Sequence, residues 1–456
     1  MSNYRFSLNP QKVKKVFTRY RSIQTKIPEP NTKKILYDLS KYESRSMHGQ
    51  LPIIWHSANN FNIFDQKKNK WIDFTSTIFV TNVGHSNKRV VNAMKNVLEQ
   101  PLYSCYAYGN KLRSEYLKKL INFAGNDFEK AFLLSAGTEA TEAALKLMRM
   151  YGQKEKKKRL GIICFQGNWH GRTLGAQLMS GNIDQKKWIG FDDNDIHHLP
   201  FPYPWDLNDC EPEEFLSRSL DNLRRNGIDI KSDICGFMLE TFQGWGAIFY
   251  PKEFVKKVEN ICKKNNILLA FDEMQSGFGR TGKKFGYEHY EVKPDLLCCG
   301  KGMGGGIPLS GVLGKAKILD LPEVGNMSST HSANPLSCAA GLAVIEELTN
   351  KNLTQKAQQK GIILFEGLNK LKYLFPNNIK YILGKGLIAS IIFKSNKTAI
   401  DASILASKIS EKCMQKGLLV VHTGRESIKI GPPLTIPNSA LKEGISVIEE
   451  AIKECI

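Results

Sequence analysis

The sequence predicts an α/β protein with a doubly wound, mostly parallel sheet. Over the middle of the chain, short apolar runs typical of buried strands alternate with longer segments that carry apolar residues at helical spacing. Two of these runs, Ile267–Phe271 and Asp295–Cys299, are followed by Asp272 and by Gly300-Lys301. Because ligands bind at the carboxyl ends of parallel strands in such sheets, we expect the Asp272 carboxylate and the Lys301 amine to share one crevice.

The chain has 456 residues, enough for two or three lobes that share a large core. We expect residues 1–85 to form an N-terminal arm and part of a small domain, and residues 86–342 to form the large domain. Residues 343–456 would complete the small α+β domain with two long helical segments around a small sheet. The segments are Leu353–Leu371 and Ala402–Lys416, and the strands are Leu387–Phe393, Leu418–His422 and Ser427–Ile430.

Composition excludes several classes of protein. Apolar residues make up 42% and charged residues 24%, as in ordinary globular proteins, and no run of apolar residues is long enough to span a membrane. The net charge is +20, but the lysines are scattered and no nucleic-acid motif appears, so we expect neither a nucleic-acid nor a membrane partner.

The cysteines and the N-terminus bear on the compartment. The 10 cysteines are dispersed, with no CxxC pair and no metal-ligand spacing, which is typical of buried thiols in a reducing compartment. We therefore expect a cytoplasmic protein without a metal. The alternative is a mitochondrial presequence, because no acidic residue precedes Glu29.

The first part of the chain shows strand and helix patterns of ordinary kind. Met1–Ser46 is a basic arm with short helices, and Leu51–Asp73 alternates like strands around a turn at Gln66–Asn69. A helix with one apolar face is expected to begin at Ser86.

The next strand, Phe132–Leu134, runs through a turn of small residues into a helix. Gly137 and Thr138 lie at the start of that helix, where free backbone N–H groups favour an anion. An ordinary capped helix is the alternative interpretation.

Two further strands end in unusual residues. Leu160–Phe165 leads to Trp169, His170 and Arg172, and Ile234–Leu239 leads to Glu240. An aromatic residue followed by His, Gly and Arg is uncommon in a plain loop, although a histidine satisfied within the loop is the favoured interpretation of His170. Between these strands, residues 181–225 are polar and are expected to form a surface excursion.

An amine and a carboxylate in one crevice allow two interpretations. Both side chains can simply be solvated at the strand ends. Alternatively, Lys301 forms a Schiff base with pyridoxal phosphate (PLP) and Asp272 pairs with the pyridine nitrogen, which is how a protein equips this cofactor as an electron sink. The second interpretation requires a desolvated lysine, so that its amine is a nucleophile near neutral pH.

Three motifs resemble the class III aminotransferases, the family that includes 4-aminobutyrate and ornithine aminotransferases. They are DEMQSGFGRTG from Asp272, GKGMGGGIPLSG from Gly300 and THSANPLSCAA from Thr330. The resemblance extends over roughly Pro52 to Ile452. It implies a fold-type-I PLP-dependent transaminase that acts on a small amine and an oxo acid, and a homodimer with shared active sites.

The resemblance also implies a role for each matching residue. Lys301 would hold the cofactor and move a proton, and Asp272 would keep the ring nitrogen protonated. The other matching positions would contact the cofactor or the substrate: Gly137 and Thr138 the phosphate, Trp169 the ring face, Gln275 the ring oxygen, Thr330 the phosphate of the neighbouring subunit, and Arg172 a substrate carboxylate. Glu240 matches the family's glutamate at the end of its strand.

Two positions depart from the family pattern. Many relatives that use glutamate carry a Glu where this chain has Trp245 and an Arg where it has Lys429. Lysine offers a point charge rather than a planar fork, so Lys429 is expected to bind a substrate carboxylate weakly, and Trp245 adds an apolar wall. Arg425 is a candidate replacement for the missing arginine.

These departures leave the substrate open. The donor is expected to be an ω-amino acid or a similar primary amine, and the acceptor can be pyruvate, another oxo acid or an aldehyde. A PLP-dependent racemase, epimerase or aminomutase of the same family is the alternative activity, and a homologue without activity is a third possibility that the intact Lys301 and Asp272 disfavour.

Overall fold

A seven-stranded sheet forms the centre of the large domain in the computed structural model, which describes residues 4–47, 49–99, 102–207, 210–394 and 399–456. Its strands follow the order β6 (Lys130–Leu134), β14 (Ser310–Gly314), β13 (Leu296–Cys299), β12 (Leu268–Asp272), β9 (Ile234–Glu240), β7 (Gly161–Phe165) and β8 (Ile196–Leu199). Strand β14 is antiparallel to both neighbours, whereas β12 pairs in parallel with β13 and β9, and β7 in parallel with β9 and β8. The expected mostly parallel α/β fold is confirmed.

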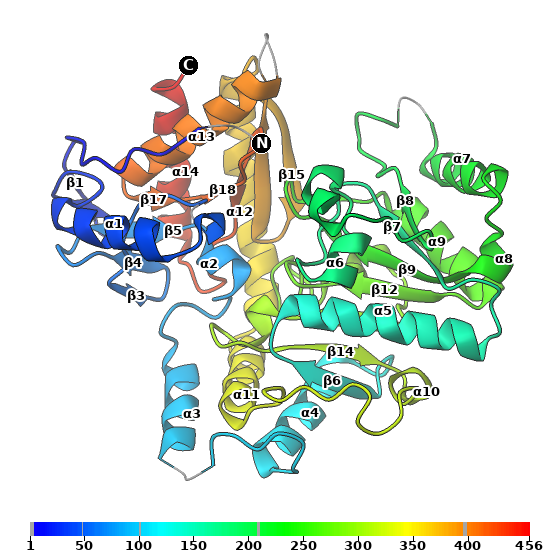
Figure 1. Cartoon of the computed structure of the whole chain (residues 1–456). Helices are drawn as coiled ribbons and strands as arrows, with labels where there is room; N and C mark the ends of the chain where they lie inside the picture. Colours follow the sequence, from blue (N-terminus) through cyan, green and yellow to red (C-terminus); the bar gives the residue numbers. More distant parts are fainter. Residues whose placement is uncertain (1–3, 48, 100–101, 208–209, 395–398) are drawn as a thin grey trace.

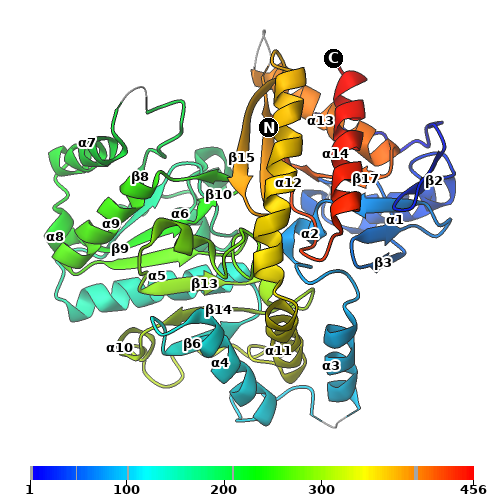
Figure 2. The ribbon, with the colours of Figure 1, turned by 180° about the vertical axis from the view of Figure 1, so that it is seen from behind.

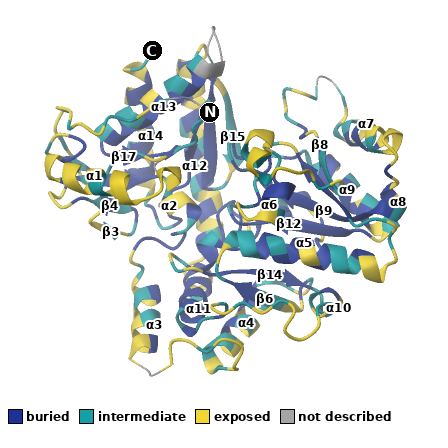
Figure 3. Cartoon of the chain, viewed as in Figure 1, coloured by how far each residue is buried: buried dark blue, intermediate teal, exposed yellow. Residues whose placement is uncertain are grey.

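Helices cover both faces of this sheet, because alternate residues of each strand point to opposite sides. In β12, Leu268 and Ala270 belong to the apolar cluster that includes helix α5 (Gly137–Lys154). Leu269 and Phe271 belong to the cluster that includes helix α9 (Lys252–Asn265). Figure 3 shows these central strands buried on both sides, which is why they are apolar throughout.

The N-terminal and C-terminal segments meet in a second sheet. Its strands are β1 (Val16–Phe17), β2 (Ser22–Ile23), β5 (Lys70–Asp73), β4 (Asn62–Phe64) and β3 (Ser57–Asn59), and β17 (Leu418–Leu419) pairs with β5 in parallel. A third, antiparallel sheet consists of β15 (Ile379–Lys385), β16 (Ile388–Phe393), β19 (Ser427–Ile430) and β18 (Val421–His422). These pairings agree with a small domain built from both ends of the chain, and the boundaries at residues 85 and 342 stay a prediction.

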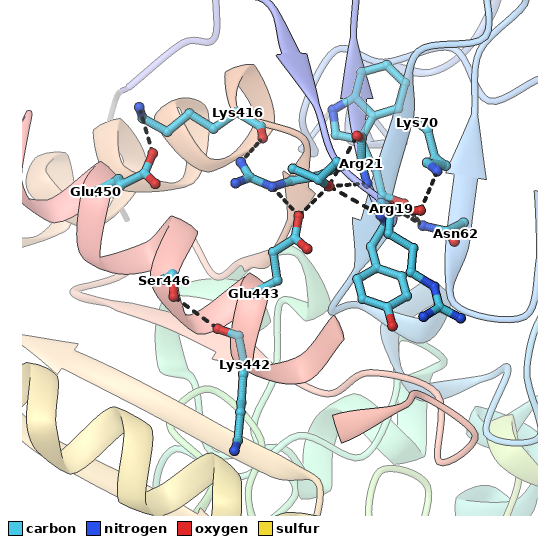
Figure 4. A network of polar contacts seen from close by, with 12 residues as sticks. Arg19, Arg21, Asn62, Lys70, Lys416, Lys442, Glu443, Ser446 and Glu450 are labelled. Carbon is cyan, nitrogen blue, oxygen red and sulfur yellow. Dashed lines mark hydrogen bonds and ion pairs between the residues drawn. The ribbon is translucent and has the colours of Figure 1, made fainter. Parts of the chain in front are cut away.

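Polar contacts fasten the N-terminal arm to the C-terminal helices α13 (Ala399–Gln415) and α14 (Asn438–Lys453) (Figure 4). The Arg21 guanidinium donates to Glu443 at 2.7 Å and to the Lys416 carbonyl at 2.7 Å. Asn62 and Lys70 donate to backbone carbonyls of the same arm, at 2.8 Å each. The arm is therefore part of the folded small domain.

Helix α12 (Leu353–Leu374) runs between the large sheet and the small domain in both Figure 1 and Figure 2. At its lower end, helix α11 (Pro335–Asn350) packs against α3 (Lys88–Leu98) and α4 (Lys111–Ala124). Helix α1 (Lys33–Tyr42) and the short helix α2 (Ser76–Phe79) belong to the N-terminal part. No helix in the described part of the chain is long and apolar enough to cross a membrane.

Two local expectations were wrong. Residues 181–225 are not only a surface excursion, because they supply the edge strand β8 and helix α7 (Pro212–Arg225). The third sheet also contains β15, which the sequence did not indicate because its residues alternate poorly and include Gly384. Both strands lie at sheet edges, where the apolar pattern is weakest.

Candidate active site

The ends of several strands of the large sheet surround one cavity of about 330 Å³. Strand β12 ends at Asp272 and β9 ends at Glu240. Lys301 is separated from the end of β13 by Gly300. The cavity is lined by Gly137, Thr138, Trp169, His170, Gly171, Arg172, Glu240, Asp272, Met274, Gln275 and Lys301. Eight of the residues given a cofactor or substrate role from the sequence are thus brought together, including the pair Asp272 and Lys301.

The Asp272 carboxylate is fixed by two contacts. Its Oδ2 lies 3.0 Å from Nδ1 of His170, and its Oδ1 accepts the N–H of Met274 at 3.0 Å. The His170 ring is buried, and its Nε2 has no hydrogen-bond partner among the described residues. The interpretation of His170 as an ordinary satisfied loop histidine is therefore wrong, since the ring holds the carboxylate at the cavity wall.

Lys301 occupies a strained position at the cavity. Its φ is 45°, in the left-handed region that non-glycine residues rarely adopt, and such strain is typical of functional sites. Burial lowers the pKa of the Lys301 amine, and the Asp272 and Glu240 carboxylates partly oppose that shift. The lowered pKa increases the share of uncharged amine near neutral pH, as a nucleophile requires.

The start of α5 forms the opposite end of the cavity. The Glu139 carboxylate accepts the N–H groups of Ser135 and Ala136 at 2.9 and 2.7 Å, whereas no side chain caps those of Gly137 and Thr138 among the described residues. A Cβ added at Gly137 would lie 2.8 Å from the Met274 sulfur, so the glycine allows a close approach here. The Thr138 hydroxyl lies 2.6 Å from that of Thr173.

Trp169 contributes a half-buried ring to the wall. Its backbone N–H donates to Glu240 Oε2 at 2.9 Å, which ties the end of β7 to the end of β9. The Arg172 guanidinium lies 4.4 Å from the centre of the Trp169 ring, in a cation–π arrangement. Arg172 is exposed, so its donors can reach an anion that enters from solvent.

Lys429 is connected to the cavity by a hydrogen bond to the lining residue Gln275. Its Nζ donates to Gln275 Oε1 at 3.0 Å, and Gln275 Nε2 lies 3.5 Å from Glu240 Oε1. Burial lowers the pKa of Lys429 to about 7, with Glu240 opposing and Lys301 adding to the shift. Burial, followed by the nearby Asp272 charge, raises the pKa of Glu240 to about 8.

Besides Lys429, the predicted residues Trp245 and Thr330 do not line this cavity. Trp245 lines a neighbouring cleft, where the Arg425 guanidinium lies 3.7 Å from the centre of its ring. Thr330 is exposed in the loop before α11. Its expected contact is with a second subunit, so the single chain does not test it.

The residues present fit PLP. Each chemical part of that cofactor has a candidate partner in the cavity. The Trp169 ring suits the ring face, the Asp272 carboxylate the ring nitrogen and the Lys301 amine, with its lowered pKa, the aldehyde. The N–H groups of Gly137 and Thr138 at the start of α5 suit the phosphate. Fold and cavity together define a fold-type-I PLP-dependent enzyme.

Comparison with known proteins places the chain within that class. The family model "Aminotransferase class-III" matches residues 43–452, and the chain belongs to this family of PLP-dependent transaminases. It is 32% identical to a leucine/methionine racemase of Thermococcus litoralis, over 88% of this chain and 91% of that protein. It is also 32% identical to the acetylornithine aminotransferase of Caldanaerobacter subterraneus, over 89% and 96% of the two chains.

Solved structures agree with the fold. An amine transaminase from an uncultivated Pseudomonas species, solved with PLP bound, has 25% identity and a TM-score of 0.81. The match covers 91% of this chain and 97% of that one. The expected family, fold class and cofactor are confirmed.

Met274 was not singled out in the sequence, and His170 was expected to be a satisfied loop histidine with no role at the site. Met274 follows Asp272 closely and lies under both Gly137 and Gly300, where an added Cβ would come within 2.8 Å and 2.5 Å of its sulfur. Its position one residue beyond the Asp-Glu pair was the available signal. His170 could have been found from its place beside Trp169 at a strand end.

Proposed function

We propose that this transaminase takes the amino group of an ω-amino acid, or of a similar primary amine with a remote carboxylate, and passes it to an oxo acid. The observation that carries the proposal is the single cavity shared by Lys301, Asp272 and Arg172. The acetylornithine aminotransferase, a relative named for an amine that carries a remote carboxylate, supports the donor class.

When bound, PLP supplies an electron-accepting ring and a carbon that exchanges amino groups. The chain supplies the proton transfers. Lys301 Nζ, whose pKa is lowered by burial, accepts a proton from the amino-bearing carbon of the substrate and returns one later. Asp272, oriented by His170 and the Met274 N–H, would be the partner of the ring nitrogen.

The remaining wall residues bind and orient. The N–H groups of Gly137 and Thr138 and the Thr138 hydroxyl would hold the phosphate. Trp169 would stack on the ring, and Gln275 would bond its oxygen. Glu240 accepts the Trp169 N–H and so keeps that ring in place.

Arg172, Lys429 and Trp245 govern the choice of substrate. Arg172 can hold a remote carboxylate with two parallel hydrogen bonds. Lys429 is engaged by Gln275, and its lowered pKa weakens its charge near neutral pH, so it captures a second carboxylate poorly. We therefore favour an acceptor with a single carboxylate, such as pyruvate, over 2-oxoglutarate.

A homodimer with shared active sites is part of the proposal. Thr330 is exposed and lies outside the cavity of its own chain, as a residue that serves a neighbouring subunit would. The ten free cysteines support a reducing compartment such as the cytoplasm.

The assignment of Lys301 can be tested by chemistry rather than by turnover. Borohydride reduction of the PLP-loaded protein fixes the cofactor to the lysine that holds it, and mass spectrometry of the peptides identifies that lysine. We expect modification at Lys301 and none there in Lys301→Ala. Modification at Lys429 instead would contradict the proposed roles.

Racemisation of an amino acid is a second candidate function. The similarity to a leucine/methionine racemase supports it, and so does a second buried amine at Lys429, close enough to Lys301 for the two charges to interact. Loss of optical rotation of leucine or methionine without any oxo acid, and with the cofactor unchanged, would favour this function over transamination.

A further inference from the structure

A second cleft of about 370 Å³ lies beside the cofactor cavity, and Trp245 is its one lining residue that the proposed function uses. Most of its lining residues come from β16, from the turn between β18 and β19, and from the loop that follows β8. Aromatic and cationic side chains dominate its lining, which consists of Tyr203, Trp205, Trp245, Lys380, Ile392, Phe393, Lys394, Ala402, Arg425 and Glu426.

One wall is formed by a stack of aromatic rings. Tyr203 and Trp205 stack with centroids 4.8 Å apart and planes 10° from parallel. The stack continues to Tyr381 at 5.1 Å and 26°. Trp245 stands 6.5 Å from Trp205 with its plane tilted by 59°, so the two indoles form adjoining walls of the cleft.

Cations border these rings. The Arg425 guanidinium lies 3.7 Å from the centre of the Trp245 ring, and Lys380 Nζ lies 5.2 Å from that of Trp205. Lys394 adds a third positive charge. Glu426 is the one carboxylate among the described lining residues, and it contacts Arg425 at 3.3 Å, so the cleft is positively charged.

We propose that this cleft binds a planar aromatic carboxylate. A planar ring packs against the indoles of Trp205 and Trp245 that line the cleft, and its carboxylate meets Arg425 and Lys380. A simple inorganic anion would not use the ring walls, and a neutral aromatic molecule would leave the cations without a partner.

The cleft is joined to the active site by one turn. Gln243 Oε1 accepts the Tyr203 hydroxyl at 2.5 Å and the Trp245 indole N–H at 2.8 Å, so it ties both aromatic walls together. The next residue, Gly244, lies so close to Gln275 that an added Cβ would be 2.3 Å from its Nε2. The ligand is therefore either the aromatic end of a substrate or a separate effector whose binding affects the cofactor cavity.

Calorimetric titration of the PLP-loaded protein tests the binding itself, which does not rest on the proposed function. The probes are phenylacetate, its uncharged amide phenylacetamide, and the non-planar cyclohexylacetate. We expect phenylacetate to bind at least about fivefold more tightly than either, because each analogue lacks one of the two recognition elements.

Variants locate the site. Arg425→Leu and Lys380→Met should each weaken phenylacetate binding by about fivefold to tenfold. Lys372→Met is the matched control, since Lys372 contacts the ring of Tyr381 at 5.6 Å but does not line the cleft, and it should change the affinity less than about twofold. Equal binding of phenylacetate and phenylacetamide, or an equal loss in the control, would overturn the proposal.

Competition between phenylacetate and the amine donor shows whether the ligand is part of the substrate or a separate effector. If phenylacetate raises the KM of the amine donor without changing kcat, the cleft holds part of the substrate. If it changes kcat while the donor still binds, the cleft serves a separate effector. If phenylacetate binds Lys301→Ala with the same affinity, the cleft is a binding site whether or not the transamination mechanism is correct.

Discussion

Replacement of Lys429 by methionine should make the protein's stability less dependent on pH. The lysine is 6% exposed, and burial lowers its pKa from 10.5 to about 7. Methionine has a similar length and carries no charge, so Lys429→Met removes the titrating group while largely filling its space.

The size of the change in the free energy of unfolding follows from the pKa shift of Lys429. One pKa unit corresponds to about 1.4 kcal/mol, so protonated Lys429 costs the folded protein about 5 kcal/mol at most. Below about pH 7 the amine is protonated in both folded and unfolded states and the full cost is present; it declines as the pH rises from about 7 to about 10.5. The stability advantage of Lys429→Met should thus shrink by about 3 kcal/mol between about pH 6 and about pH 9.

Two other effects have to be separated from this one. Loss of the bond to Gln275 lowers the stability of the variant by about 1 kcal/mol at every pH, so the trend with pH is the informative quantity. Glu240 and Lys301 face Lys429, and Glu240 itself has a raised pKa of about 8. The comparison is therefore repeated in a Glu240→Gln background.

The assay is urea unfolding of the cofactor-free protein, followed by tryptophan fluorescence over this pH range. Lys442→Met, at an exposed lysine of α14, is the control and should leave the pH trend unchanged. If the difference in the free energy of unfolding between Lys429→Met and the wild-type protein stays constant with pH, the account of Lys429 as a desolvated amine is refuted.

Three further changes have definite expected outcomes. Lys301→Ala should abolish turnover and the absorbance band of the lysine-bound cofactor, and a variant that keeps both would exclude Lys301 as the holding lysine. Arg172→Ala should raise the KM of amines that carry a carboxylate by about tenfold, through loss of a charge-assisted bond, and leave amines without one unaffected. An equal loss for both kinds of amine in steady-state kinetics would make Arg172 structural. His170→Phe should weaken PLP binding by about tenfold in a fluorescence titration, because the Asp272 carboxylate loses its partner, and His170→Gln should restore part of it; equal affinities in both variants would contradict this positioning role.

The sequence predicted the parts of the fold that local patterns determine. Buried strands such as β9 and β12 are apolar along their whole length, and each ends abruptly in a charged residue, so both the parallel sheet and the position of Asp272 could be predicted. The edge strands β8 and β15 are only partly buried, and their mixed composition resembles that of loops.

Side-chain direction was the part of the site that could not be predicted. Trp245 follows Gly244 in the turn between the short strands Phe242–Gln243 and Ile248–Phe249, and nothing in the local sequence indicates that its ring faces Tyr203 and Arg425 rather than the cofactor cavity. The pairing of His170 with Asp272 depends on two strand ends that are far apart in the sequence. Such contacts follow from the register of β7, β9 and β12 in the sheet.

The most direct test of the central claim is a half-reaction on the PLP-loaded protein. Single amines and ω-amino acids are added without any oxo acid, and the cofactor is then released with acid and separated by chromatography. Transamination predicts conversion of PLP to pyridoxamine phosphate by ω-amino acids, and none in Lys301→Ala. If PLP is recovered unchanged while an added amino acid loses its optical activity or rearranges, the claim that this chain is a transaminase of ω-amines is contradicted.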